Sequence, residues 1–147
     1  MDKVFFLSAD KVVNAKNRSL IKELIVQLFK KETTSLNRVN YIFCSDKYLL
    51  KINRQFLNHE TYTDIITFPL SGEDDPVHGE IYMSVDRIKE NAKAFKVSYQ
   101  NELLRVIIHG ALHLCGYKDH SKAEKHNMRS KENYYLNKFF VSRETDI

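Results

Sequence analysis

The chain has 147 residues, of which 43% are hydrophobic and 29% are charged, and it carries a formal net charge of +4 with a pI near 9.0. This is the length of one ordinary domain, with enough apolar residues for a core. No segment approaches the roughly 18 apolar residues of a membrane span, and the N-terminus lacks the features of a signal peptide, so we expect a cytoplasmic protein. The positive charge suits an anionic partner such as nucleic acid without identifying one.

Strand and helix patterns alternate in the first half of the chain. Residues 4–8 and 38–44 are rich in β-branched and aromatic side chains, which is typical of strands. Residues 17–31 place an apolar stripe opposite a charged face at helical spacing, which predicts an amphipathic helix. A short helix is predicted to begin at Asp46, and it carries the large apolar residues Leu49, Leu50, Ile52 and Phe56.

The second half of the chain contains two further strand patterns and three helical ones. Strands are predicted over residues 63–70 and 79–85, with a short acidic loop between them. Helices are predicted over residues 86–95, from a cap at Ser98 to Cys115, and from a capping box that opens at Ser121 to about Phe140. Because helices and strands interleave, we expect one sheet covered by helices.

The most informative segment is residues 106–116, which read VIIHGALHLCG. His109 and His113 are four residues apart, so both rings lie on one face of a helix and can reach a common point. Zincins share this spacing but carry Glu directly after the first His, where this chain has Gly110, so the general base of that class is missing. A glycine here also leaves room, either for a bulky substrate or for a close neighbouring backbone.

The apolar surroundings of the two histidines place them in the core. An unpaired imidazole buried there costs about 1–3 kcal/mol, so we expect the pair to bind a metal rather than to stay as isolated core histidines. Gly116 ends the helix, and Asp119 and His120 follow as competent ligands that a turn can bring back to the pair. A third protein ligand leaves one coordination position open, as in catalytic centres.

The two cysteines, Cys44 and Cys115, each lie in an apolar segment and form no CxxC pair. Buried, reduced thiols are the expected state of such residues. Cys115 lies two residues after His113 and therefore on a different helix face, which argues against its acting as a further ligand.

The segment from His109 to Tyr117 resembles the signature H-G-x-L-H-L-x-G-Y-D-H of the YbeY endoribonuclease family. Residues 49–53 with 63–69, residues 79–84 and residues 102–106 resemble other motifs of that family, in order and with compatible spacing. The resemblance implies a single α+β domain over residues 1–147, with a mixed four-stranded sheet packed with helices and a helix-borne metal site. The implied cofactor is one divalent metal ion, usually assigned as Zn²⁺.

The same resemblance implies an activity and a cellular role. The implied activity is metal-dependent cleavage of single-stranded RNA. The implied role is maturation of the 3′ end of 16S ribosomal RNA together with ribosome quality control, which makes ribosomal RNA and the small ribosomal subunit the expected partners.

The third ligand departs from the family pattern. The third His of the family falls six residues after the second, and in this chain that position is Asp119, with His120 one place later. An ungapped alignment keeps the downstream Met128 in register and favours Asp119, whereas ligand type favours His120. We expect Asp119 as the third ligand and keep His120 as the alternative.

The family also carries an Arg, thought to contact substrate phosphate, at the position of Leu57 in this chain. Arg54, Arg105 and Arg87 are the candidates to replace it, unless they are surface charges, which is the interpretation we favour for Arg87. Asp64, at the head of its strand, either orients a ligand or a water molecule or caps neighbouring amides in a turn. Period-2 alternation places Glu80, Tyr82 and Ser84 on one strand face, which either lines the cleft or faces solvent.

Two other functions fit the same residues. One is a metal-dependent hydrolase of a non-RNA substrate such as a small amide or a peptide, which Gly110 disfavours because the usual general base is absent. The other is a ribosome-associated factor that binds RNA without cutting it, which the loss of the family arginine at Leu57 suggests.

Overall fold

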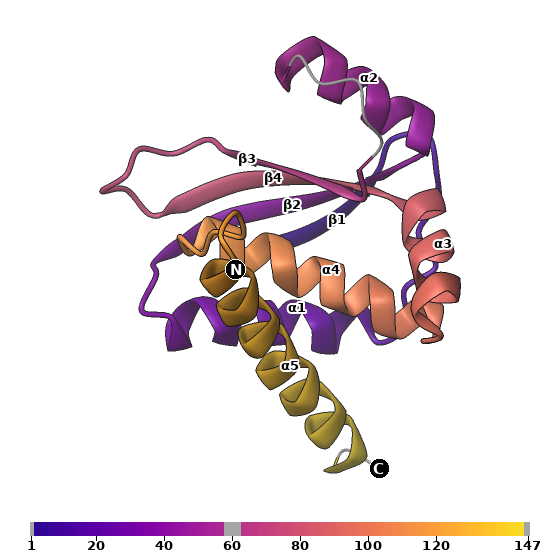
Figure 1. Cartoon of the computed structure of the whole chain (residues 1–147). Helices are drawn as coiled ribbons and strands as arrows, with labels where there is room; N and C mark the ends of the chain where they lie inside the picture. The colour runs from indigo at the N-terminus through magenta and orange to yellow at the C-terminus, as the bar shows by residue number, and fades with distance from the viewer. Residues whose placement is uncertain (1, 58–62, 146–147) are drawn as a thin grey trace.

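The chain folds into four strands and five helices within residues 2–57 and 63–145, the part that this computed structural model describes (Figure 1). In order these are β1 (Val4–Ser8), α1 (Arg18–Lys31), β2 (Leu36–Cys44), α2 (Asp46–Leu57), β3 (Ile65–Pro69), β4 (Val77–Ser84), α3 (Val85–Phe95), α4 (Tyr99–Leu114) and α5 (Lys122–Thr145). Every predicted element is present, with small shifts at most ends. The largest difference is α5, which continues to Thr145 instead of ending near Phe140.

The strands form one mixed sheet in the order β1-β2-β4-β3. The first three strands of that order are parallel, whereas β3 is an edge strand that runs antiparallel to β4. Pro69 stands at the end of β3, which suits an edge because proline has no N–H for a further ladder. The mixed four-stranded sheet and the single α+β domain confirm the predicted fold class.

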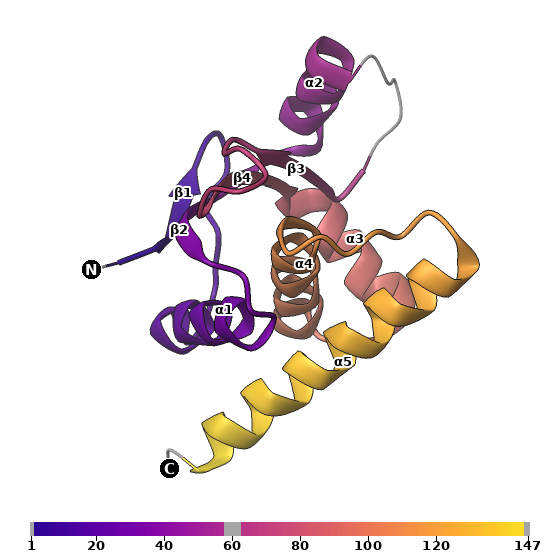
Figure 2. The ribbon, with the colours of Figure 1, turned by 90° about the vertical axis from the view of Figure 1, so that its left-hand side faces the viewer.

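The two faces of the sheet are covered unequally. Helices α1 and α4 pack under one face, α5 crosses beneath both of them, and α2 lies alone on the opposite face (Figures 1 and 2). The main core lies on the side of α1 and α4, where β2 contributes the fully buried residues Val39, Tyr41 and Phe43. A small second core forms under α2 around Leu49 and Ile66.

Helix α4 runs through the main core, as its sequence predicts. Six of its apolar side chains are at most 1% exposed: Leu103, Val106, Ile107, Ile108, Ala111 and Leu112. The Ser98 side chain caps the helix by accepting a hydrogen bond from the N–H of Asn101 at 3.1 Å, and Gly116 ends it with a φ of 103°. Burying each large aliphatic side chain contributes about 1.5–3 kcal/mol, so packing against the sheet fixes the position of α4.

Gly110 is a packing residue. A Cβ atom at this position would lie 2.9 Å from Cδ1 of Ile81 and 3.0 Å from Cδ1 of Ile65, both on the sheet. The glycine therefore lets α4 approach β4 and β3 closely, and it does not open space over the two histidines. The close neighbour that the sequence left open is therefore present, but it consists of isoleucine side chains of the sheet and not of backbone.

Helix α5 begins at the predicted capping box. The N–H of Ser121 donates to Oε1 of Glu124 at 2.8 Å, and the N–H of Glu124 donates to Oγ of Ser121 at 3.1 Å. The helix then crosses α4 and packs against it. None of the helices in the described part of the chain has a stretch long and apolar enough to cross a lipid bilayer.

Candidate metal centre

Three ligand atoms converge beside the C-terminal half of α4. The Nε2 atoms of His109 and His113 lie 3.0 Å apart, and Oδ2 of Asp119 lies 3.3 Å from the first and 3.5 Å from the second. Tetrahedral Zn²⁺ with ligand bonds of about 2.0–2.1 Å requires ligand atoms about 3.3 Å apart. The three side chains already have this spacing, so they fit a small divalent ion.

The turn after α4 explains how Asp119 reaches the histidines. The N–H of Tyr117 donates to the carbonyl of Leu112 at 3.0 Å, and the N–H of Gly116 donates to the carbonyl of His113 at 3.0 Å. These two bonds form a Schellman motif, which reverses the chain direction at the left-handed glycine. Asp119 thereby faces the pair, whereas His120 is exposed and, among the described residues, does not belong to the converging group.

The hydrogen bonds of the two rings fix which nitrogen faces the centre. Nδ1 of His113 lies 2.9 Å from the carbonyl oxygen of Tyr117, and a carbonyl only accepts, so this nitrogen carries the proton. Nδ1 of His109 lies 2.6 Å from Oε2 of Glu132, and we assign its proton in the same way. Both Nε2 lone pairs are then free to bind a metal, and the partners on Nδ1 hold each ring in orientation.

A buried ion-pair network holds Glu132, the hydrogen-bond partner of His109. Arg105 donates to Glu102 through Nε at 2.9 Å and to Glu132 through NH1 at 3.1 Å. The side chains of Glu102 and Glu132 are each only 2% exposed. Burial by itself raises the pKa of Glu132, but the hydrogen bond from His109 and the charge of Arg105 outweigh it and leave this pKa below its ordinary value.

Asp64 lies next to this network, directly before β3. Its carbonyl accepts a hydrogen bond from the N–H of Ser84 at 3.0 Å, which ties it to the end of β4. Burial raises the pKa of the Asp64 carboxyl, and the nearby charges of Arg105 and His109 only partly oppose this rise. The sequence left Asp64 open as a turn residue or a site residue, and the structure puts its carboxyl within electrostatic reach of His109.

The charges around the centre do not balance without a cation. Four carboxyl groups gather here, from Asp64, Glu102, Asp119 and Glu132. Arg105 is their buried cationic partner, and Arg129, 3.7 Å from Glu132, is 57% exposed and therefore well screened. A divalent cation between the two histidines and Asp119 would compensate the excess negative charge, which is a second sign that the site fits a metal.

The arginines expected to replace the family arginine occupy different places. The guanidinium of Arg105 forms ion pairs with the buried carboxylates of Glu102 and Glu132, so it contacts the centre through the partner of His109. Arg54 is exposed on α2, and α2 lies on the opposite face of the sheet from α4 (Figure 1). Leu57, at the end of the same helix, is 41% exposed. The structure therefore does not bring Arg54 to the histidines.

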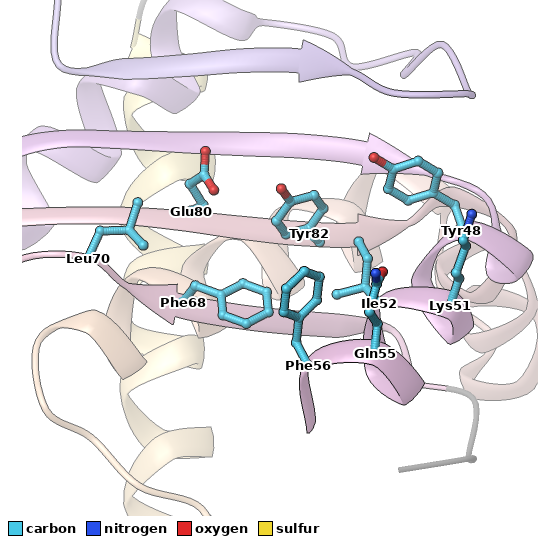
Figure 3. A pocket seen from close by; sticks show the side chains of 9 residues that line it. All are labelled: Tyr48, Lys51, Ile52, Gln55, Phe56, Phe68, Leu70, Glu80 and Tyr82. Carbon is cyan, nitrogen blue, oxygen red and sulfur yellow. The ribbon is translucent and has the colours of Figure 1, made fainter. Parts of the chain in front are cut away.

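The strand face with Glu80 and Tyr82 also lies away from the metal centre. Both residues line a hollow of about 450 Å³ between α2 and the strands β3 and β4, together with aromatic side chains such as Phe56 and Phe68 (Figure 3). Ser84 is buried and accepts a hydrogen bond from the N–H of Arg87 as the cap of α3. This face therefore lines neither the metal centre nor its approach.

Both cysteines are free thiols outside the converging group of ligands. Burial raises the pKa of Cys44 and of Cys115 to about 12, so both stay neutral at physiological pH. Cys44 is buried, as the sequence predicts, whereas Cys115 is only partly buried.

Sequence reasoning missed Glu132 and Glu32. A signal for Glu132 was present, because it interrupts the buried stripe of α5 formed by Met128, Tyr135 and Phe139, and a buried charge at a core position needs a partner. Glu32, at the end of α1, carries no such signal, since its partners come from distant parts of the chain.

Glu32 anchors the turn that carries Asp119. Its carboxylate accepts hydrogen bonds from the hydroxyls of Tyr117 at 2.6 Å and Tyr135 at 2.5 Å, and Nζ of Lys131 lies 3.3 Å away. Burial raises the pKa of Glu32, but these hydrogen bonds outweigh it and lower the pKa below its ordinary value. The carbonyl that orients His113 and the hydroxyl that holds the turn therefore belong to the same residue, Tyr117.

Comparisons with known proteins agree with this geometry. A family model described as "Endoribonuclease YbeY" matches residues 5–140. A protein named Endoribonuclease YbeY from Flavobacterium psychrophilum is 54% identical over 112 residues, which cover 76% of this chain and 79% of the relative. A protein of the same name from Cytophaga hutchinsonii is 45% identical over 133 residues, covering 90% and 93%.

A solved structure shows the same fold. It is the solution structure of a protein from Thermotoga maritima, which is 31% identical, covers 97% of this chain and 93% of its own, and superposes with a TM-score of 0.67. The family match extends over nearly all of the residues that build the sheet, the histidine helix and the turn after it. The chain therefore belongs to the YbeY family.

Proposed function

We propose that this protein is a metal-dependent endoribonuclease that cuts single-stranded RNA. The observation that carries the proposal is the convergence of His109, His113 and Asp119 at spacings that suit a tetrahedral ion, in a chain whose relatives are named endoribonucleases. The cofactor we propose is one divalent ion, with Zn²⁺ the best match to two imidazoles and one carboxylate. The proposed domain covers residues 1–147.

Each residue of the centre has a proposed task. A bound divalent ion supplies Lewis acidity, which polarises a phosphodiester and offsets negative charge that develops during cleavage. The Nε2 atoms of His109 and His113 and the carboxylate of Asp119 hold it, while Glu132 and Arg105 position His109. The carboxylate of Asp64 accepts a proton from the attacking oxygen, a task that its raised pKa favours because the acceptor is then better matched to neutral pH.

The cellular substrate we propose is the 3′ end of 16S ribosomal RNA, cut in the cytoplasm on the small ribosomal subunit as part of ribosome maturation and quality control. The family resemblance and the net charge of +4 support this assignment. Small subunits that carry precursor 16S RNA, incubated with the purified protein, should yield the mature 3′ end. Cleavage of free oligonucleotides without any change in such subunits would contradict the ribosomal assignment alone.

One set of substrates tests the activity and its competitors. Purified protein is incubated with a single-stranded RNA, an RNA hairpin and a peptide, with and without a chelator. We expect cleavage of the single strand only, loss of cleavage with chelator, and recovery when Zn²⁺ is added back. His113→Ala should lower the rate at least about 100-fold, and His120→Ala, an exposed neighbour outside the group, is the matched control.

The alternatives give different results in the same assay. Chelator-sensitive peptide cleavage without RNA cleavage would identify a hydrolase of non-RNA substrates. RNA binding without cleavage would identify a non-cutting RNA-binding factor, the function suggested by Leu57 at the position of the family arginine. Unfolding on chelation, seen by circular dichroism, would show a structural metal.

A further inference from the structure

A second hollow, separate from the metal centre, lies between α1 and α5. These two helices lie side by side (Figures 1 and 2). The hollow has a volume of about 280 Å³ and is lined by Leu24, Gln27, Lys30, Lys31, Tyr135 and Lys138. Its three lysines are exposed, none of its lining residues is acidic, and across the described ranges no carboxylate forms an ion pair with any of these three.

Tyr134 lies beside two of the lysines that line this hollow. Nζ of Lys31 lies 5.0 Å and Nζ of Lys138 lies 5.5 Å from the centroid of the Tyr134 ring, which belongs to a residue that is 37% exposed. The hydrogen bond from Lys31 and the charge of Lys138 lower the pKa of Tyr134, which is the effect of uncompensated positive charge. The hollow thus combines an accessible aromatic ring with three lysines that pair with no carboxylate in the described part of the chain.

Hydrogen bonds connect one residue of the basic hollow to the turn of the metal centre. Tyr135 lines the hollow, and its hydroxyl donates to Glu32, which also accepts the hydroxyl proton of Tyr117. Nζ of Lys131 lies 6.0 Å from the centroid of the Tyr117 ring, two residues before the proposed ligand Asp119. Along α5, Lys131 and Lys138 are seven residues apart, which is about 10 Å. The hollow therefore lies about two helical turns along α5 from Lys131, which packs against the turn of the metal centre and pairs with Glu32.

We propose that this hollow binds the phosphate backbone of single-stranded RNA adjoining the cleavage site, with Tyr134 available to stack on a base. Lys30, Lys31 and Lys138 supply compact charges for phosphates, and stacking on an aromatic ring tolerates any base. Binding releases counterions from the RNA, so these lysines contribute affinity that decreases as salt rises. The inference rests on the proposed ribonuclease function and names where its substrate is held outside the centre.

The test measures RNA affinity as a function of salt for two double variants. Fluorescence anisotropy with a labelled, unstructured RNA of about 12 nucleotides, a length within the usual site sizes, is recorded in chelator so that the RNA stays intact. Lys31→Gln with Lys138→Gln should reduce the slope of log affinity against log salt by about 1.4, because each lost contact to a single strand contributes about 0.7. Between 50 and 200 mM salt, the wild-type affinity should then fall about sevenfold more than that of the variant.

The control removes the same charge from another element. Lys89→Gln with Lys93→Gln changes two exposed lysines of α3, and Nζ of Lys89 also lies over an aromatic ring, 5.8 Å from the centroid of Tyr99. The control should keep the wild-type slope, and thermal unfolding should match for all three proteins.

Three outcomes decide the inference. A reduced slope in the hollow variant alone supports it. An unchanged slope there, or an equal reduction in the control, overturns it, since the lysines then serve another anion or only the net charge matters. If the wild-type protein cuts RNA but the hollow variant has the wild-type salt dependence, only this inference fails and the proposed function stands. If the wild-type protein cuts no RNA, the proposed ribonuclease function fails.

Discussion

Glu132→Gln is the most informative single substitution in this protein. Glutamine keeps the shape of the side chain and still accepts one hydrogen bond from Nδ1 of His109, now 2.6 Å from Glu132. It removes the negative charge that holds this proton and that pairs with Arg105 at 3.1 Å. The substitution therefore tests whether the buried carboxylate tunes the centre or only fills space.

The expected effects follow from these contacts. Loss of a carboxylate behind a metal-binding histidine lowers metal affinity about 10–100-fold, or about 1.4–2.7 kcal/mol. A hydrogen bond to a charged group contributes about 1.5–3 kcal/mol and a neutral one about 1 kcal/mol, and Arg105 keeps its bonds to Glu102, so the free energy of unfolding should fall by about 1–3 kcal/mol. Competition with a chromophoric chelator measures the affinity, and urea unfolding of the metal-free protein measures the stability.

Glu102→Gln is the matched control. Glu102 is as buried as Glu132 and binds the same arginine, but it does not contact either histidine in the described structure. It should lower stability by a similar amount while leaving metal affinity within about threefold of wild type, in line with the usual size of indirect effects. Equal losses of metal affinity in the two variants, or none in Glu132→Gln, would refute the reasoning.

The pH dependence of stability gives an independent check on Glu132. Its pKa in the folded protein lies below the ordinary value of 4.5, so its charged form is favoured by folding. The resulting stabilisation is complete well above pH 4.5 and is lost as the pH falls through the lower, folded-state pKa. Urea unfolding from pH 7 towards acid should therefore show a smaller loss of stability in Glu132→Gln than in wild type.

Four further substitutions test other parts of the structure. Asp64→Asn should lower the rate of RNA cleavage about 100-fold or more, since it removes a proton acceptor. The same substitution should raise the free energy of unfolding at pH 7, because burial disfavours the charged form of the carboxylate. Tyr117→Phe should weaken metal binding a few-fold, because it releases the turn from Glu32. Tyr135→Phe loses a hydrogen bond to the same carboxylate, so both variants should lower the free energy of unfolding in urea by about 1–2 kcal/mol, but Tyr135→Phe should leave metal affinity unchanged. Gly110→Val should lower the free energy of unfolding by about 1–3 kcal/mol through overpacking against Ile81, as measured by thermal unfolding.

Contrary results would each remove one argument. Undiminished cleavage by Asp64→Asn would leave that carboxyl without a catalytic task. Equal metal affinities for the two tyrosine variants would show that Glu32 acts on stability only. A Gly110→Val protein with wild-type stability but no RNA cleavage would show that position 110 makes room for substrate and not for the sheet.

The sequence predicts the parts of the centre that depend on local periodicity. The spacing of His109 and His113 puts both rings on one helix face, and Gly116 predicts the end of that helix, because both features act within one or two turns of backbone. The choice of Asp119 over His120 came from the family register, and the geometry of the turn supports it. Strand and helix types follow from local pattern in the same way.

The parts that the sequence could not predict depend on contacts between distant segments. Glu32 reaches Tyr117 across 85 positions, and Glu132 reaches His109 across 23, distances that no periodic pattern encodes. The same limit applies to Arg54. Its place in the sequence, three residues before the position of the family arginine, does not indicate which face of the sheet α2 covers. Asp64 and Arg105 were named as site residues, but their tasks became definable only once burial and partners were known.

The close packing at Gly110 restricts how the protein can evolve. Adding the glutamate of a zincin at this position would direct the carboxylate into the sheet beside Ile65 and Ile81, where it would be buried without a partner, rather than towards the two histidines. We therefore expect that Gly110→Glu alone does not convert this centre into a peptidase of that class. The surface around the centre can change to accept other substrates. The orientation of α4, fixed by its contact with the sheet at Gly110, keeps a zincin-type general base out of the centre.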